Sequence, residues 1–322
     1  MDAVAALVED ATAAPSMHNA QPWKFHFSTA DRAFRVRADT ERAMPHTDPT
    51  NRALHIGCGA ALFNLRVAAA HAGWEPDTRL LPDPADPDLL ATVRLTEPVR
   101  PGTELAELYP AIRRRHTSRY PFSEEEVPAA IQDALCAAAL REGARLVFPG
   151  AWHVESVLGL VQDAEGRDSL DPDAFEDIRR WTRLGNDAVT SSDGIPEYAF
   201  GPRKRGGKAP VRDFAGRRPA ADREAATFES TPHLALLGTG GDRPEDWLTA
   251  GQAMERVLLE ATLDGLATSL TSHALESPEL RWAVRDPHSE TGFVQMVLRL
   301  GYGEPGPATP RRPVEEVLTI EP

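Results

Sequence analysis

The sequence predicts a mixed helix-and-strand protein assembled from two related halves. Short stretches of alternating apolar and polar residues, such as "KFHF" and "FRVRA", are typical of half-buried strands. Between the strands lie longer stretches with a helical period, among them "GAALFNLRVAAAHAGW" and "GQAMERVLLEATLDGL". Both of these helices are rich in alanine and leucine, end near a glycine and precede a strand. We therefore expect a degenerate internal duplication.

Composition favours a soluble globular protein. The 322 residues are 41% hydrophobic and 26% charged, which is enough to bury a core in one large domain or two. A formal net charge of -14 argues against binding to nucleic acids or anionic membranes. With only Cys58 and Cys136, the chain has no disulfide framework, and we expect a reducing cytoplasm. The acidic N-terminus and the lack of any apolar run of roughly 18 residues predict neither a signal peptide nor a membrane span.

In the first half, residues that terminate helices and strands mark the ends of the predicted elements. Pro15 ends the first helix because it lacks a backbone N–H, and Gly73 ends the second. The polar stretch "STADRA" separates the strands of a hairpin. The predicted elements are a helix over 2–14, strands over 24–27 and 34–38, a helix over 52–73 and a strand over 91–97.

A second unit is predicted to begin near Glu104, which divides the chain into units 1–103 and 104–322. Ser123 is the expected N-cap of a helix whose first turn is acidic. The segment 191–225 is rich in Gly, Pro and Arg, and a loop of this length indicates a lid, a binding loop or disorder. The other predicted elements are strands over 144–150, 233–240 and 293–303 and helices within 152–190 and over 244–265.

The stretch "APSMHNAQPWKF" gathers small polar side chains on a turn between a helix and a strand. Ser16, His18, Asn19 and Gln21 offer a hydroxyl, an imidazole and two amides, which together could bind a polar, planar ligand. The alternative is an Asx-type turn in which these groups satisfy the local backbone. Both readings are open at this point.

The stretch "RRRHTSRYPF" places four arginines within seven residues, together with Thr117 and Ser118. Guanidinium groups bind phosphate in pairs and hydroxyls add short hydrogen bonds, so this stretch is a candidate anion site. The alternative is a solvated basic face. Arg311 and Arg312 in "PRRP" give a weaker signal of the same kind.

Other patterns carry less chemistry. "GTGGDRP" is an incomplete dinucleotide fingerprint, with Arg243 in place of the third glycine, and predicts a plain turn. The ten histidines show no metal-binding spacing, so we expect no metal site. There is no GxSxG motif of an α/β-hydrolase. His18 and His116 are the histidines considered as general acids, although most isolated histidines are structural.

Taken together, three stretches resemble one flavoprotein superfamily. "APSMHNAQPWKF" resembles the APSxxNxQPWxF motif of the FMN-dependent nitroreductase superfamily, and "RHTSR" resembles its RxSxR-type phosphate motif. The stretch from "EDWLTAGQAMERVLLEATLDGL" through "QMVLRLGYG" to "RRPVEEVL" resembles its C-terminal half. The similarity covers nearly the whole chain and is greatest to the Acg subgroup, in which two nitroreductase-like units are fused.

The resemblance implies an α+β fold with mainly antiparallel sheets flanked by helices, in which two tandem units form an intramolecular pseudo-dimer. In this superfamily FMN lies at the interface of two subunits, one giving the APSxxN loop and the other the phosphate arginines. Here the first half has kept only the loop and the second half only the arginines; the second half reads "ALREGARLVFPG" where its own loop would fall. The two motifs are complementary, so we expect one FMN site per chain.

The resemblance also implies roles for individual residues. Arg115 and Thr117, joined by Arg311 or Arg312, would hold the FMN phosphate. Arg119 would lie near the N1/O2 edge of the flavin, where a fixed cation raises the reduction potential. The loop "SLTSH" would pass near N5, and it lacks the usual Pro-x-Glu-Gly of the family. The residues implied around the ring are Pro15, Ser16, Met17, Asn19, Leu270, Thr271 and Ser272.

The implied function is that of an FMN-dependent oxidoreductase. It would take a hydride from NAD(P)H and pass it through the flavin to a flat, electron-poor acceptor of aromatic or quinone-like chemistry, with no side-chain acid or base required. Two alternatives remain open: a protein that stores or sequesters FMN under a lid formed by 191–225, and a tailoring oxidase for a specific metabolite. We expect a monomeric pseudo-dimer or a homodimer without nucleic-acid or membrane partners.

Overall fold

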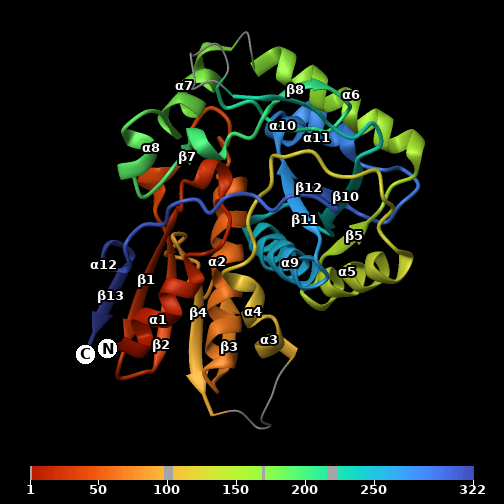
Figure 1. Cartoon of the computed structure of the whole chain (residues 1–322). Helices are drawn as coiled ribbons and strands as arrows, with labels where there is room; N and C mark the ends of the chain where they lie inside the picture. Colours follow the sequence, from red (N-terminus) through yellow and green to blue (C-terminus); the bar gives the residue numbers. More distant parts are fainter. Residues whose placement is uncertain (1, 98–103, 169–170, 216–222) are drawn as a thin grey trace.

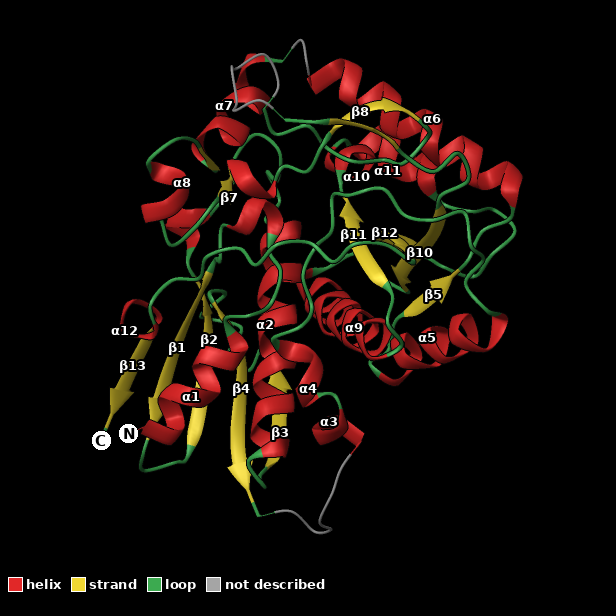
Figure 2. Ribbon diagram, viewed as in Figure 1, coloured by secondary structure: helices red, strands yellow, loops and turns green. Residues whose placement is uncertain are grey.

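Two sheets flank a central pair of long helices, as Figures 1 and 2 show for the computed structural model of this chain. The structure describes residues 2–97, 104–168, 171–215 and 223–322. The central helices are α2 (Arg52–His71) and α9 (Pro244–Leu263), and they pack directly against each other. The sheets are mainly antiparallel, so the predicted α+β class is confirmed.

The two sheets share one strand order. The first sheet runs β13-β1-β2-β4-β3 and the second runs β11-β12-β10-β5. Apart from β13, the first sheet has β1, β2, β3 and β4 in chain order, and the second has β5, β10, β11 and β12. In both sheets the first strand in chain order pairs with the second, the second with the fourth and the fourth with the third. All these pairs are antiparallel. A long helix, α2 or α9, connects the second and third strands in both. The shared topology supports the predicted internal duplication.

The strands of the first sheet are β1 (Trp23–Ser28), β2 (Ala33–Ala38), β3 (Glu75–Leu80), β4 (Leu89–Thr96) and β13 (Leu318–Glu321). Those of the second are β5 (Arg145–Val147), β10 (His233–Thr239), β11 (Ala267–Thr271) and β12 (Phe293–Gly301). The shorter helices outside the inserted region are α1 (Asp2–Ala11), η1 (Met17–Asn19), η2 (Thr40–Arg42), α3 (Glu104–Glu107), α4 (Tyr109–Ile112), α5 (Ala129–Arg141), α10 (His273–Glu276), α11 (Pro278–Val284) and α12 (Val314–Val317).

Two glycines let α2 and α9 approach closely. A Cβ atom on Gly59 would lie 2.4 Å from the carbonyl oxygen of Leu248, and one on Gly251 would lie 2.1 Å from that of Ile56. Both distances are well inside van der Waals contact, so a larger residue at either position would push the helices apart. Each glycine is the first residue of one of the two stretches that predicted the duplication. The crossing is therefore a pseudo-symmetric contact between the two halves.

Helix α2 is the one helix in the described ranges that is long and apolar enough to cross a membrane. Of its apolar window, 78% is buried inside the protein. It packs against α9 and against the first sheet. This burial accounts for its apolar composition.

The N-terminal hairpin forms as its alternating sequence predicts. Phe25 on β1 pairs with Val36 on β2, and Phe34 on the same face is also buried. The preceding helix α1 ends before Pro15, as predicted, although its last residue is Ala11. The hairpin confirms that the pattern after the "APSMHNAQPW" loop is that of a strand.

The helix predicted to begin at Ser123 begins later. Helix α5 starts at Ala129, directly after Pro128. The Ser123 hydroxyl accepts a hydrogen bond from the backbone N–H of Glu125 at 3.3 Å, before the helix. A residue before proline is disfavoured in the helical region, so the acidic stretch stays non-helical and the prediction of Ser123 as N-cap was wrong.

Strands β3, β11 and β13 were not predicted from the sequence. The last of them pairs in parallel with β1, with Phe27 opposite Ile320. The C-terminal end of the chain therefore extends the first sheet, although it belongs to the predicted unit 104–322. The predicted boundary after residue 103 adjoins residues 98–103, which lie outside the described residues, and stays a prediction.

A region of short elements is inserted between β5 and β10 and forms the upper part of the molecule in Figure 1. The predicted lid, 191–225, lies in this region; its residues 216–222 are outside the described part. It has a small apolar core made by Ile195, Ala199, Phe200, Phe214 and Ala215. The inserted elements are α6 (Ala151–Asp168), α7 (Pro172–Arg180), β6 (Thr182–Arg183), α8 (Asp187–Thr190), β7 (Ile195–Pro196), η3 (Glu197–Ala199), β8 (Arg203–Gly206) and β9 (Ala225–Thr227).

Candidate functional site

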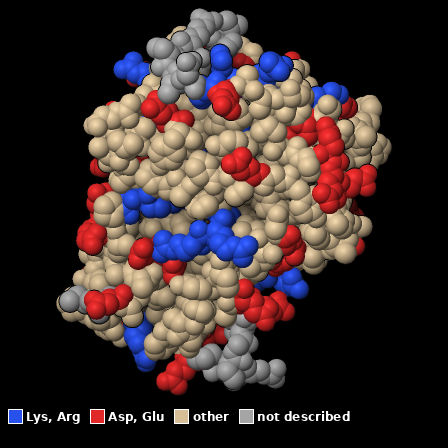
Figure 3. Space-filling view, viewed as in Figure 1, with Lys and Arg blue, Asp and Glu red and all other residues tan. Residues whose placement is uncertain are grey.

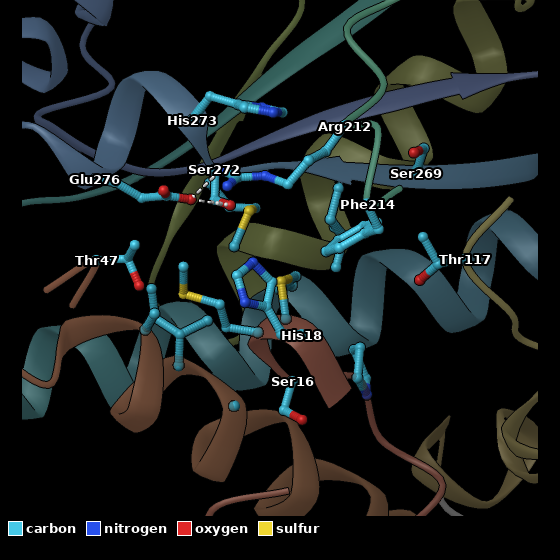
Figure 4. A pocket seen from close by; sticks show the side chains of 18 of the residues that line it. Ser16, His18, Thr47, Thr117, Arg212, Phe214, Ser269, Ser272, His273 and Glu276 are labelled. Atoms are coloured by element: carbon cyan, nitrogen blue, oxygen red, sulfur yellow. Dashed lines mark hydrogen bonds and ion pairs between the residues drawn. The ribbon is translucent and has the colours of Figure 1, made fainter. Parts of the chain in front are cut away.

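A cavity lies where the N-terminal loop, α2, the arginine motif, the inserted region and the end of β11 meet (Figure 4). It encloses about 900 Å³ of atom-free space, part of which is open to solvent. Seven of the predicted site residues line it: Pro15, Ser16, Met17, Thr117, Arg119, Leu270 and Ser272.

The N-terminal loop has a constrained backbone. His18, Asn19 and Gln21 have φ values of 49°, 55° and 53°, in the left-handed region that side chains rarely adopt. The Ser16 hydroxyl accepts the backbone N–H of Gln21 at 2.9 Å, and Ser16 packs on Gly57 of α2. Such local strain is most often found at functional sites, where the surrounding contacts hold it in place.

Asn19 connects the loop to two distant segments. Its amide nitrogen donates to the carbonyl oxygens of Gly194 and Pro310 at 2.9 and 3.0 Å, and its Oδ1 accepts from Arg311 at 3.0 Å. The side chain is therefore fully engaged behind the cavity wall and does not line the cavity. Gln21 makes a similar link, donating to the carbonyl of Ser192 at 2.9 Å.

Two arginines from different motifs meet beside this loop. Nη2 of Arg115 and Nη2 of Arg311 donate to the same carbonyl oxygen, that of Ala13, at 2.9 and 3.0 Å. Glu255 of α9 forms an ion pair with Arg115 at 3.4 Å, and both side chains are buried. Burial and the neighbouring Arg115 lower the pKa of Arg311 to about 9, while burial raises the pKa of Glu255 to about 7. The cluster carries excess positive charge and suits an anion.

The structure does not bring Arg312 into this cluster. Its guanidinium pairs with Asp39 at 3.2 Å, and its backbone N–H donates to the Oε1 atom of Gln21 at 2.8 Å. His116 does not line the cavity either, and burial together with Arg115 lowers its pKa to about 4. Arg312 therefore acts within the fold of the first half rather than at the cavity.

The inserted region reaches into the cavity beside Arg119. Nη1 of Arg119 donates to the carbonyl of Ala199 at 3.0 Å, and its guanidinium carbon lies 4.9 Å from the centre of the Phe214 ring. Burial, and then Arg212, lower the pKa of Arg119 to about 10. The other side of Phe214 meets the His18 ring edge-on, with the centres 5.3 Å apart. Figure 4 shows Phe214 in the middle of the site, with Arg212 above it and His18 below it.

His18 presents an unpartnered imidazole. It is buried, and neither of its ring nitrogens has a hydrogen-bond partner in the part of the chain that the structure describes. Burial, then Arg212 and Arg119, hold the pKa of His18 well below its usual value, so the ring is neutral. Unsatisfied buried polar atoms are costly and indicate a group that a ligand completes.

The end of β11 and the start of α10 form the opposite wall. Leu270 and Thr271, predicted in a loop, belong to the strand β11, and Thr271 donates to the carbonyl of Pro210 at 2.9 Å instead of lining the cavity. The Ser272 hydroxyl donates to Glu276 at 2.7 Å, and Glu276 also pairs with Arg212. The wall is therefore a hydrogen-bonded unit shared by the second half and the inserted region.

The cavity is electropositive. Arg52, Arg119 and Arg212 line it, against the single carboxylate of Glu276 among its described lining residues. Figure 3 shows that Lys and Arg side chains also gather in a band across the middle of the visible face. In a chain with a net charge of -14, this local excess of positive charge favours a negatively charged ligand.

Sequence reasoning missed several lining residues, namely Arg52, Arg212, Phe214, His273 and Glu276. Arg212 and Phe214 lie in the segment 191–225, whose length and composition had indicated a lid or binding loop. That was the sequence signal that could have pointed to them. His273 is the last residue of the "SLTSH" stretch expected near the flavin, which was the signal for it. No local pattern distinguishes Arg52 or Glu276, because only the packing of α2 and α10 places them here.

A two-unit α+β protein with an electropositive cavity lined by residues of both units is the class that the fold and the site define. Residues 112–302 match the Nitroreductase family, and the chain belongs to that family. It is 32% identical to the Mycobacterium tuberculosis protein named "Putative NAD(P)H nitroreductase Rv3131" over 96% of this chain and 88% of that protein. It is 29% identical to the one named "Putative NAD(P)H nitroreductase acg" from the same organism, over 99% and 96%.

Among solved structures, a nitroreductase with bound FMN from Bacteroides fragilis is similar over 64% of this chain and 93% of that chain, with 16% identity and a TM-score of 0.35. The FMN-dependent nitroreductase NfnB from Mycobacterium smegmatis, in complex with NADPH, is similar over 62% and 90%, with 17% identity and a TM-score of 0.37.

Proposed function

We propose that this protein binds FMN in the cavity between its two units and transfers a hydride from NAD(P)H, through the flavin, to a flat, electron-poor acceptor. The observation that carries the proposal is the meeting of Pro15, Ser16 and Met17 with Thr117 and Arg119 around one cavity. The two motifs are far apart in sequence and come from different units. The full-length relatives named as NAD(P)H nitroreductases support the electron donor.

The residues present fit the flat ring of a flavin. Apolar lining side chains would pack against the ring, and the unpartnered His18 imidazole and the Arg119 guanidinium would supply its polar contacts. Arg119 is a fixed cation, which favours the more negative, reduced form of a bound flavin and so raises its reduction potential. The remaining residues proposed to contact the ring are Pro15, Ser16, Met17, Leu270 and Ser272.

The residues present also fit the phosphate. Arg115 and Arg311 converge on the Ala13 carbonyl, and Nε of Arg115 lies 3.4 Å from Oε1 of Glu255. Paired guanidinium groups form short, charge-assisted hydrogen bonds with phosphate, and the Thr117 hydroxyl can add another. We assign Arg115, Arg311 and Thr117 to the phosphate.

In this mechanism bound FMN supplies the hydride chemistry, and the chain supplies position, charge and exclusion of water. The N-terminal loop and β11 line the cavity and would hold the flat ring between them. Phe214 and Arg212 close the cavity on the side of the inserted region. Asn19 holds that region in place through Gly194.

A titration with FMN and an anaerobic reduction test the proposal. The purified protein should be yellow, or should quench the fluorescence of added FMN with a stoichiometry of one flavin per chain. Excess NADPH without oxygen should then bleach the visible absorbance of the bound flavin, and a quinone should restore it. A colourless protein that takes up no FMN would contradict the proposal.

Storage of FMN without turnover is a second candidate, favoured by one observation. The inserted region fills part of the cavity with Phe214 and is tied down at Asn19, Arg119 and Thr271. A closed cover of this kind protects a bound cofactor and hinders access by a nicotinamide. Stopped-flow mixing separates the two candidates: a flavin that stays oxidised under excess NADPH but is reduced by dithionite indicates storage.

A further inference from the structure

His273 lies at the inner wall of the flavin cavity. It is the first residue of α10, follows directly on the β11 wall and is 3% exposed. Neither ring nitrogen has a hydrogen-bond partner within the described residues. Figure 4 shows it above Arg212 and Ser272. It is a second buried, unpartnered imidazole at this site, and the mechanism above does not use it.

The same imidazole contacts a carboxylate that faces outward. Its Nε2 lies 3.7 Å from Oε1 of Glu165 on α6, whose side chain is 38% exposed. Glu165 lines a separate open groove within the inserted region, between α6 and the segment 204–210, together with Glu155, Lys204 and Pro210. Pro210 borders this groove, and the next two residues, Val211 and Arg212, line the flavin cavity. The pair Glu165–His273 thus spans the wall between the groove and the cavity.

We propose that Glu165 and His273 form a proton relay that carries a proton from the open groove to an acceptor bound in the flavin cavity. The inference rests on the proposed function, which consumes one proton per turnover. A quinone-like acceptor gains one hydride, which NAD(P)H gives up through the flavin, and one proton, and becomes a hydroquinone while NAD(P)H becomes NAD(P)+. The inserted region forms one side of the cavity, and the pair would deliver the proton through that side.

The chemistry of the pair suits this task. Protonated Glu165 passes its proton to Nε2 of His273 while the imidazole releases the proton of Nδ1 to the acceptor in the cavity. Solvent then reprotonates Glu165, and a ring flip of His273 restores the starting arrangement of donor and acceptor nitrogens. A neutral imidazole has one donor and one acceptor nitrogen, as this exchange requires. A gap of 3.7 Å is longer than a hydrogen bond, and such contacts often tighten only when the site is loaded.

The charges around the pair keep it in the required state. Arg212 and Lys204 from the inserted region, His18 from the N-terminal loop and Glu165 from α6 face His273. Burial, then Arg212, His18 and Lys204, hold the pKa of His273 well below its usual value, which keeps the ring neutral. Burial also raises the pKa of Glu165, against the opposing effects of Lys204 and Arg212, so this carboxyl keeps its proton to higher pH than an ordinary one.

The contact can be tested without flavin on the full-length chain. In a 15N-histidine NMR titration, with His273→Gln to assign the signal, the His273 ring nitrogens should shift as Glu165 titrates. Glu165→Gln should abolish this pH-dependent shift, which appears as an inflection in the titration curve of the His273 nitrogens. The matched control is Glu155→Gln, on the same helix and in the same groove but paired with Lys208 at 2.7 Å, and it should leave the inflection unchanged. An identical titration curve in Glu165→Gln would overturn the pairing.

Transfer of the proton can be tested on the FMN-loaded protein. After reduction with dithionite, the protein is mixed anaerobically with p-benzoquinone, which needs a proton, or with ferricyanide, which takes electrons alone. Glu165→Gln and His273→Gln should slow reoxidation by the quinone at least about tenfold. Both variants should leave ferricyanide unaffected. Equal slowing with both acceptors, as a distorted site would give, or no slowing with either, refutes the relay.

Chemical rescue separates proton transfer from a structural role, because acetate can replace a missing proton donor but cannot repair a distorted site. In Glu165→Ala the groove stays open, so acetate in the buffer should restore the quinone rate, whereas it should not rescue His273→Gln. Failure of acetate to act on Glu165→Ala would count against the relay. FMN titration of every variant keeps this result separate from the proposed function: if the wild type binds no FMN, the function fails, while the NMR test of the pair still stands.

Discussion

Arg311 donates a hydrogen bond to Oδ1 of Asn19 at 3.0 Å, across 292 positions of sequence. The same guanidinium shares the Ala13 carbonyl with Arg115. One residue of the C-terminal tail therefore connects the loop of the first half to the arginine motif of the second. The proposed phosphate site exists only where these three segments converge.

Replacing Arg115 with alanine should weaken FMN binding by about 1.5–3 kcal/mol, because a charge-assisted phosphate contact is lost. Fluorescence titration measures the affinity. Arg114→Ala is the matched control, since its neighbouring guanidinium is exposed and reaches only the Thr262 carbonyl, at 3.5 Å. Arg115 also pairs with Glu255, so thermal melting and Arg115→Lys, which keeps the charge, separate binding from folding. Unchanged affinity in Arg115→Ala would remove this residue from the site.

Glu255 should make stability depend on pH. Its ordinary pKa of 4.5 is raised to about 7 by burial, so between these values the folded protein holds a proton that the unfolded chain releases. The free energy of unfolding should therefore fall as pH rises through this window. Urea denaturation at several pH values should show a shallower fall for Glu255→Gln, whereas Glu315→Gln, which is exposed on α12, should follow the wild type. A parallel fall in both variants would contradict the assignment.

Removing the Phe214 ring should open the flavin cavity. The ring lies between His18 and Arg119, so Phe214→Ala should speed the reduction of bound FMN by NADPH in stopped-flow measurements. Phe175→Ala is the control, since this phenylalanine is 41% exposed on α7 and does not line the cavity. A rate equal to that of the wild type would mean that the inserted region does not limit access.

The crossing of α2 and α9 should tolerate no side chain at Gly251. A Cβ atom there would lie 2.1 Å from the Ile56 carbonyl, so Gly251→Ala should cost about 1–3 kcal/mol of stability by overpacking. Gly159→Ala is the matched control on α6, where a Cβ meets nothing within 4 Å. Alanine loses less backbone freedom than glycine when the helix folds, so this variant should be more stable by roughly 0.5–1 kcal/mol. Chemical denaturation measures both, and a neutral Gly251→Ala would show that the helices can separate freely.

Local sequence determined the elements with a strong period or a clear stop signal. The hairpin around Phe25 and Phe34, both central helices and the strand β12 follow directly from alternation, helical spacing and the glycines and prolines at their ends. The two binding motifs were also visible, because each is a short run of unusual side chains. Together with the resemblance to the nitroreductase superfamily, their complementarity predicted one FMN site per chain.

Only the tertiary structure decided what those side chains contact. Asn19, expected at the flavin ring, is used to fasten the inserted region, and Arg312, expected at the phosphate, is paired with Asp39 in the first half. The strand β13 is too short and polar to be predicted from its sequence, and it forms because β1 offers an unpaired edge. The pairing of Glu165 with His273 likewise depends on how α6 packs on α10. Hydrogen-bond partners and charge neighbours are set by contacts between distant segments, and a local pattern cannot encode which of several polar groups a folded chain will bring within 3 Å of another.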